Sequence, residues 1–240
     1  MRLIGVGVGP GDPELVTVKA VRILATAGRV FVPVLDAADV GRAEATVRAH
    51  VAHDRVERLV FALNERDDTA RRERYWDAAG GRVAQWLRET GGTAAFATIG
   101  DPNVYATFGY LAQTVQGLLP EVAVDTVPGI TAMQALAAAA GQPLVEGSEP
   151  LTLLPLARGD LSALKAALAV DGTVVVYKAG RHLSEIAALV SEAGREAVYG
   201  AHLGMADQEL RPLAQVQGPA PYLATVLVPA RRSDSRGGKL

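Results

Sequence analysis

The chain has 240 residues, 49% hydrophobic and 21% charged, with a formal net charge of −2 and no cysteine. This charge balance disfavours a strongly basic nucleic-acid-binding surface, and the absence of cysteine excludes disulfides, thiolate metal sites and thiol nucleophiles. Because the chain has neither an apolar run of about 20 residues nor a signal-peptide pattern at the N-terminus, we expect a cytoplasmic protein without a membrane partner.

Apolar runs of strand length alternate with longer helical patterns, which predicts an α/β fold. In the first part of the chain we expect strands at 2–8, 29–33, 56–61, 93–99 and 122–127, the second ending at Pro33. Asp12 and Pro13 have the pattern of a helix N-cap and first helical residue, with Leu15, Val18 and Ile23 on the buried face. Further helices are expected at 38–52, 69–90, 104–119 and 131–141.

Residues 143–150 are rich in glycine, proline and charge, which is typical of a linker. After them the pattern restarts, with strands expected at 151–156, 172–178 and 222–229 and helices at 160–169 and 183–194. The sequence therefore predicts two α/β lobes, at 1–145 and 150–230. The polar segment 231–240 is expected to be a disordered tail.

The glycine-rich stretch after the first strand does not have the spacing of a nucleotide site. A dinucleotide fingerprint needs glycines at G-x-G-x-x-G. When the motif is started at Gly5, Gly7 or Gly9, the place of its third glycine is taken by Pro10, Asp12 or Glu14 respectively. The phosphate-loop pattern also fails, because Lys19 follows no glycine. The loop therefore has a different role.

Polar or glycine-bearing turns follow four predicted strands, at 9–12, 100–102, 128–131 and 178–181. Ligands of open α/β sheets bind beyond the carboxyl ends of the strands, where such turns converge. Any one of these turns alone is more typical of an ordinary cap or turn. Together they indicate a ligand site.

Other chemistry has weaker support. His50 and His53 have helical spacing without an evident third ligand, which favours a solvated helix face over a metal site. His182 and His202 follow predicted strands and could border a cleft. The sequence contains no G-x-S-x-G elbow of a hydrolase nucleophile.

Taken in order, these turns resemble one family. The segments "GVGVGPGDPELVTVKAVRILATAGRVFVP", "GDPNVYATFGYL" and "VPGITAMQALAAAAGQPLVEGSEPLTLLP" resemble motifs of the tetrapyrrole (corrin/porphyrin) methylases, class III S-adenosylmethionine-dependent methyltransferases. The resemblance extends from residue 3 to about 228. "VFVPVLDAADVGRAEATVRAHV" and "LVFALNERDDTARRERYWDAAGGRVAQWL" are similar to the branch that methylates carbon 20 of precorrin-2, giving precorrin-3A, in cobalamin (corrin ring) biosynthesis.

The resemblance implies two α/β lobes with an active-site cleft between them, a homodimer, S-adenosyl-L-methionine as methyl donor, a tetrapyrrole substrate and no protein-bound metal. Carried over by position, the donor site comprises Gly100, Asp101, Val104, Thr131, Ala132, Lys178, Ala201, Leu203, Pro221 and Tyr222. The opening loop, with Gly9, Pro10, Gly11 and Asp12, is expected to face the tetrapyrrole, its glycines leaving room for the macrocycle.

Within this frame, we expect Arg42, Arg66 and Arg181 to bind substrate carboxylates and either Asp12 or Tyr105 to accept the proton lost from carbon 20. Three alternatives stay open. One is a sibling methylase that acts on cobalt-precorrin-2 or at another ring position. The second is a methylase of the same fold that acts on a macromolecule, as in diphthine synthesis or ribosomal RNA methylation. The third is a non-catalytic tetrapyrrole-binding module.

Overall fold

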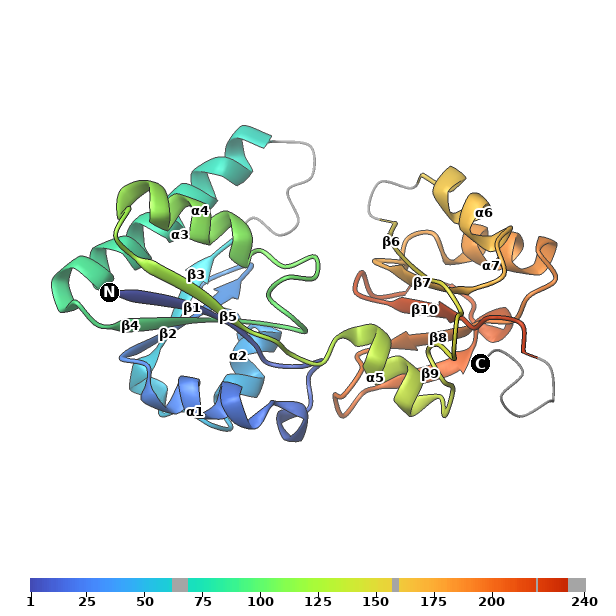
Figure 1. The fold of residues 1–240 in the computed structure, drawn as a ribbon, viewed down its shortest axis with the longest axis horizontal. Helices are drawn as coiled ribbons and strands as arrows, with labels where there is room; N and C mark the ends of the chain where they lie inside the picture. The colour runs from blue at the N-terminus through green and yellow to red at the C-terminus, as the bar shows by residue number, and fades with distance from the viewer. Residues whose placement is uncertain (62–68, 157–159, 219, 233–240) are drawn as a thin grey trace. The chain divides into compact units, whose positions relative to one another are not determined.

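The computed structural model describes residues 1–61, 69–156, 160–218 and 220–232 (Figure 1). The chain divides into two compact units, Met1–Thr131 and Ala132–Leu240. This division precedes the linker expected at 143–150, because helix α5 (Ala132–Ala139) packs its Leu136 and Ala137 into the core of the second unit. The segment that the sequence places at the end of the first lobe is thus part of the second unit.

The first unit is built on a parallel sheet of strand order β3-β2-β4-β1-β5. The strands are β1 (Arg2–Gly7), β2 (Arg29–Val34), β3 (Val56–Val60), β4 (Thr93–Thr98) and β5 (Ala123–Val127). The prediction that Pro33 ends the second strand was wrong, since β2 continues to Val34. Beyond Phe31 this strand pairs with β3 alone, so Pro33 lies where one side of the strand needs no N–H donor.

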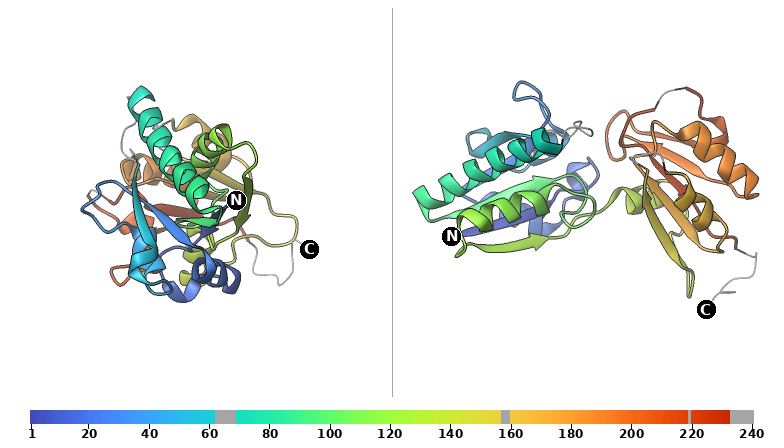
Figure 2. Two further views of the ribbon diagram at one scale, coloured as in Figure 1. Left: turned by 90° about the vertical axis from the view of Figure 1, so that its left-hand side faces the viewer. Right: turned by 90° about the horizontal axis from the view of Figure 1, so that it is seen from above.

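Two helix layers cover the sheet of the first unit (Figures 1 and 2). On one face, α1 (Val18–Thr26) and α2 (Arg42–Val47) pack on the side chains of Ile4, Val6 and Val30. On the other, α3 (Thr69–Thr90) and α4 (Phe108–Leu118) pack on Leu3 and Phe96. Because successive strand side chains point to opposite faces, each strand contributes to both cores. The α/β fold expected from the apolar pattern is confirmed.

The first helix differs from the prediction. Asp12 caps only a short 3-10 turn, η1 (Pro13–Leu15), by accepting a hydrogen bond from the backbone N–H of Glu14 at 2.8 Å. A second cap, Thr17, accepts from the N–H of Ala20 at 3.2 Å, and α1 begins after it. This break rotates the helix face, so Val18, expected to be buried, is 86% exposed.

The second unit contains a mixed sheet of strand order β6-β7-β10-β8-β9. The strands are β6 (Leu151–Pro155), β7 (Thr173–Tyr177), β8 (Val198–Ala201), β9 (Glu209–Pro212) and β10 (Thr225–Val228). Only β6 and β7 are parallel, and the remaining pairs are antiparallel. The sequence indicated β8 only through the expectation that His202 follows a strand, and it did not predict β9, which is short and exposed at every position, leaving no apolar alternation to recognise.

The helices α6 (Ser162–Leu168) and α7 (Leu183–Glu192) cover one face of this sheet, and α5 covers the other. Successive side chains of β7 point alternately to the two faces of the sheet. Val174 and Val176 belong to the core under α6 and α7, whereas Val175 and Tyr177 pack with Leu136 of α5. The side chain of Tyr177 therefore lies on the α5 face of the sheet.

Candidate functional site

The predicted turns of the first unit meet at the carboxyl edge of its sheet. β1 lies between β4 and β5, so the loops that follow these three strands are neighbours. The N–H of Gly100 donates to the carbonyl of Gly9 at 2.8 Å, and the N–H of Val8 donates to the carbonyl of Thr98 at 2.9 Å. The opening glycine loop and the turn after β4 are thus hydrogen-bonded to each other.

Glycines close this edge by backbone-to-backbone packing. A Cβ on Gly129 would lie 2.1 Å from the carbonyl oxygen of Gly100, and one on Gly7 would lie 2.5 Å from the same oxygen. Such distances leave no space for a side chain at either position. These two glycines therefore allow the loops to approach each other, a role different from the one that the sequence suggested for the neighbouring Gly9 and Gly11.

Asp101 connects the turn after β4 to the turn after β5. It is 9% exposed, and its Oδ1 accepts from the N–H of Asn103 at 2.8 Å. Its Oδ2 accepts from the N–H of Gly129 at 3.0 Å. Hydrogen bonds to a carboxylate are about twice as strong as neutral ones. Asp101 thus holds the loop conformation at the predicted donor site.

The opening loop and the η1 turn after it are also held by α2 and by the turn that follows α2. The hydroxyl of Thr46 donates to the carbonyl of Gly11 at 3.2 Å, and Nε2 of His50 lies 3.1 Å from the carbonyl oxygen of Pro13. Arg42 begins α2 one turn before Thr46, which places this candidate substrate-binding cation on the helix that holds the loop. His50 therefore has a structural contact that its sequence spacing did not indicate.

A buried carboxylate of α2, that of Glu44, attaches this helix to the sheet. The Glu44 side chain is fully buried and forms ion pairs with Arg48 and, at 2.7 Å, with Arg58 of β3. Burial opposes ionisation of this carboxyl, but the hydrogen bonds from Arg58 and Arg48 outweigh it and lower the pKa of Glu44 below its usual value. The ionised group links α2 to the edge strand β3.

The predicted donor residues of the second unit also gather at one edge of their sheet. Thr225, the first residue of β10, is in register with Tyr177 on one side and with Gly200 on the other. The Lys178 turn and the end of β8, which is Ala201, therefore lie on either side of the start of β10. The 221–224 turn, with Pro221 and Tyr222, leads into this start, and Leu203 follows Ala201 by two residues. Lys178 has a φ of 60°, an uncommon conformation for a residue with a side chain.

Two close backbone contacts fix the turn after β7. The N–H of Ala179 donates to the carbonyl of Ala224 at 3.0 Å. A Cβ on Gly180 would lie 2.1 Å from the carbonyl oxygen of Pro221. The Lys178 turn and the Pro221 turn are thus packed directly against each other.

The sequence did not single out Tyr177, although it borders this edge. Its hydroxyl oxygen accepts a hydrogen bond from the N–H of Met133, in the first turn of α5, at 2.9 Å. The continuous apolar run at 174–177 predicts only a strand at this position. A tyrosine at the end of a buried strand has a polar tip that needs a partner, which is the signal that could have found it.

The remaining candidates are placed less specifically. Asp12 and Tyr105 lie in the two hydrogen-bonded loops of the first unit, and Tyr105 is 46% exposed with a φ of 49°. Val104 follows in the same turn as Asp101, its N–H bonded to the Asp101 carbonyl at 3.2 Å. Arg181 is exposed in the turn after Lys178. Arg66 lies outside the described residues.

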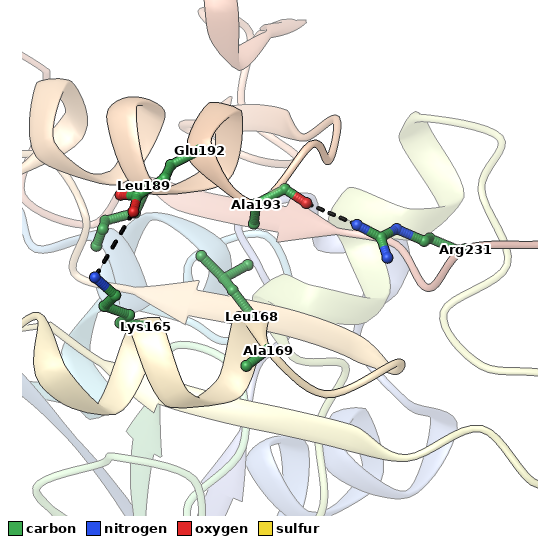
Figure 3. A pocket seen from close by; sticks show the side chains of 7 residues that line it. All are labelled: Lys165, Leu168, Ala169, Leu189, Glu192, Ala193 and Arg231. Atoms are coloured by element: carbon green, nitrogen blue, oxygen red, sulfur yellow. Dashed lines mark hydrogen bonds and ion pairs between the residues drawn. The ribbon is translucent and has the colours of Figure 1, made fainter.

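A groove between α6 and α7 lies elsewhere in the second unit (Figure 3). Leu168 and Leu189 line it, and at its rim Lys165 Nζ lies 3.7 Å from Glu192 Oε1. α6 ends just before β7 begins, and α7 runs back after β7 ends, so the groove lies at the amino end of β7, away from Lys178. Of the predicted site residues that the structure describes, none lines this groove.

In the described part of the chain, no group of three or more His, Cys, Asp or Glu side chains is arranged to hold a metal ion. None of the helices in that part combines the length and apolarity needed to cross a membrane.

Comparison with known proteins places the chain in a family. Residues 2–217 match the family model described as Tetrapyrrole (Corrin/Porphyrin) Methylases. The chain is a tetrapyrrole methylase. The family predicted from the motifs is therefore confirmed, and the turns described above are those of a methylase.

Relatives extend the comparison. This tetrapyrrole methylase is 36% identical over 238 residues to a precorrin-2 C(20)-methyltransferase of Sinorhizobium sp, covering 95% of each chain. It is 40% identical over 156 residues to a probable cobalt-precorrin-2 C(20)-methyltransferase of Methanocaldococcus jannaschii, covering 64% of each. A Thermus thermophilus uroporphyrin-III C-methyltransferase, solved in complex with S-adenyl homocysteine, has the same fold (TM-score 0.64, 22% identity, 95% and 97% of the chains covered).

Proposed function

We propose that this tetrapyrrole methylase transfers a methyl group from S-adenosyl-L-methionine to carbon 20 of precorrin-2, giving precorrin-3A, in cobalamin biosynthesis. The observation that carries the proposal is the 36% identity to a precorrin-2 C(20)-methyltransferase over nearly the whole of both chains. We further propose a cytoplasmic homodimer that needs no protein-bound metal and has no nucleic-acid partner.

The reaction needs alignment more than reactive side chains. Carbon 20 attacks the methyl group, the bond between methyl carbon and sulfur breaks, and S-adenosylhomocysteine leaves as a neutral thioether. The proton on carbon 20 is then lost to restore conjugation. Because the sulfonium is already a good leaving group, holding donor and acceptor in line supplies much of the rate, with effective molarities of about 10⁵ M or more.

For the tetrapyrrole, we assign the opening loop Gly9-Pro10-Gly11-Asp12 and the cations Arg42, Arg66 and Arg181. The attachment of this loop to Thr46 and His50 supports a preorganised surface, because a loop already held in place loses little entropy on binding. Asp12 and Tyr105 are the proposed proton acceptors. The Asp12 carboxylate already accepts one hydrogen bond, from the N–H of Glu14.

For the methyl donor, the proposed contacts in the first unit are Gly100, Asp101, Val104 and Thr131. In the second unit they are Ala132, Lys178, Ala201, Leu203, Pro221 and Tyr222. The first set clusters at the carboxyl edge of its sheet, where ligands of α/β sheets bind, which supports this assignment. The second set, apart from Ala132 at the start of α5, also gathers at one edge of its sheet.

A second candidate is the same transfer to cobalt-precorrin-2. The identity of 40% to the probable cobalt-precorrin-2 enzyme of Methanocaldococcus jannaschii, over part of the chain, favours keeping this candidate. Both candidates require the same donor, the same ring carbon and the same loops. They differ only in whether cobalt is already in the ring.

One anaerobic assay tests both. The purified protein is given isotopically labelled methyl donor with precorrin-2 and with cobalt-precorrin-2 in parallel, and the product mass and methyl position are measured by mass spectrometry and NMR. One added methyl at carbon 20 is expected, and the faster substrate decides between the candidates. Donor binding without transfer to either substrate would refute the proposed function.

A further inference from the structure

Tyr177 joins two segments that carry proposed donor-binding residues of the second unit. It is the last residue of β7 and directly precedes Lys178. Its hydroxyl oxygen lies 2.9 Å from the backbone nitrogen of Met133, which directly follows Ala132 in the first turn of α5. One side chain thus connects the Lys178 turn with the start of α5, 44 residues earlier in the chain.

This hydrogen bond satisfies a group that a helix cannot satisfy itself. The first four N–H groups of an α-helix have no acceptor within the helix, and Met133 is the second residue of α5. The rest of the Tyr177 side chain packs in the cluster of Leu136, Val175 and Leu203, which fixes the position of its hydroxyl. The start of α5 is therefore held at a defined distance from the end of β7.

We propose that Tyr177 is a positioning residue for the methyl donor, holding the Ala132 end of α5 in the conformation that binds it. The inference rests on the proposed function, since Ala132 and Lys178 are proposed donor contacts. Without the hydroxyl, the first turn of α5 has more conformations available, and donor binding must select one of them. The observed affinity is the intrinsic affinity multiplied by the fraction of molecules in the binding-competent conformation, so it falls when that fraction falls.

The test is Tyr177→Phe, which removes one oxygen and keeps the ring. A neutral hydrogen bond contributes about 0.5–1.5 kcal/mol, so we expect S-adenosylhomocysteine to bind about two- to thirteenfold more weakly by calorimetric titration. In the methyl-transfer assay, KM for the donor should rise by a similar factor while kcat is retained, because Tyr177 takes no part in the bond-making step.

The matched control is Tyr199→Phe. Tyr199 lies in β8 of the same sheet, but its side chain belongs to the opposite core, under α6 and α7. This variant removes a tyrosine hydroxyl from the same unit without altering the contact to α5. We expect it to bind S-adenosylhomocysteine like the wild type, whatever its effect on the thermal midpoint.

Three outcomes are distinguishable. Weaker donor binding by Tyr177→Phe alone supports the inference. Unchanged donor affinity in Tyr177→Phe, even with a lower thermal midpoint, overturns it and leaves Tyr177 a structural residue. If the wild type itself binds no S-adenosylhomocysteine, the proposed function is refuted, and this inference with it.

Discussion

Asp101 offers the sharpest test of how the first unit holds its loops. Substitution Asp101→Asn keeps one carbonyl oxygen to accept from Asn103 but places an NH₂ group against the N–H of Gly129, where Oδ2 now accepts at 3.0 Å. One charge-assisted hydrogen bond at a residue only 9% exposed is lost. Such a bond contributes about 1.5–3 kcal/mol.

If that energy holds the loop in its donor-binding conformation, the dissociation constant for S-adenosylhomocysteine should rise by about 10- to 160-fold. The measurement is calorimetric titration of the wild type and the variant, with the thermal midpoint of each ligand-free protein recorded in parallel. Asn103→Ala is the matched control, because it removes only an exposed side-chain bond to Thr126 and keeps the N–H that Asp101 binds.

The two measurements separate two roles. A loop-holding role requires a lower midpoint of the ligand-free protein together with weaker binding. Weaker binding with an unchanged midpoint would mean that Asp101 acts by touching the donor, and the loop-holding role would be wrong. Donor affinity within about twofold of the wild type would refute both roles and remove Asp101 from the donor site.

Three further predictions concern the groups around the two sheet edges. Thr46→Val removes the hydroxyl that holds the opening loop and should raise KM for the tetrapyrrole about three- to tenfold while donor affinity, measured by titration, stays unchanged. The pKa of Glu44 is lower in the folded protein than in the unfolded chain. The ionised carboxylate therefore stabilises the fold at pH values above the usual carboxyl pKa, and this stabilisation is lost as the pH falls through the lowered pKa. Glu44→Gln should therefore have a lower thermal midpoint than the wild type at pH 7, and the gap should close on acidification; a constant gap would contradict this. Gly180→Ala forces a Cβ to 2.1 Å from the Pro221 carbonyl and should lower the thermal midpoint and weaken donor binding, whereas Gly117→Ala, with open space in α4, should stabilise by about 0.5–1 kcal/mol.

The sequence determined the local elements and the family. The helix predicted at 69–90 is found as α3 (Thr69–Thr90), and the strands of the first unit lie within a few residues of their predicted ranges. These features depend on residues close together in the chain: apolar side chains recur every 3.6 residues in a helix and every 2 in a strand, and glycine and proline interrupt the elements. The motif turns were recognisable for the same reason, since each is a short continuous segment.

Tertiary structure decided what joins those segments. Placement of α5 in the second unit depends on the burial of Leu136 against β7 and β10, strands that follow much later in the chain. The closure at Gly7 and Gly129 and the contact of Tyr177 with Met133 link residues far apart in sequence. A local pattern shows that a residue is small or amphipathic, but its partner is set by how strands pair and which faces are buried, and this depends on the whole chain.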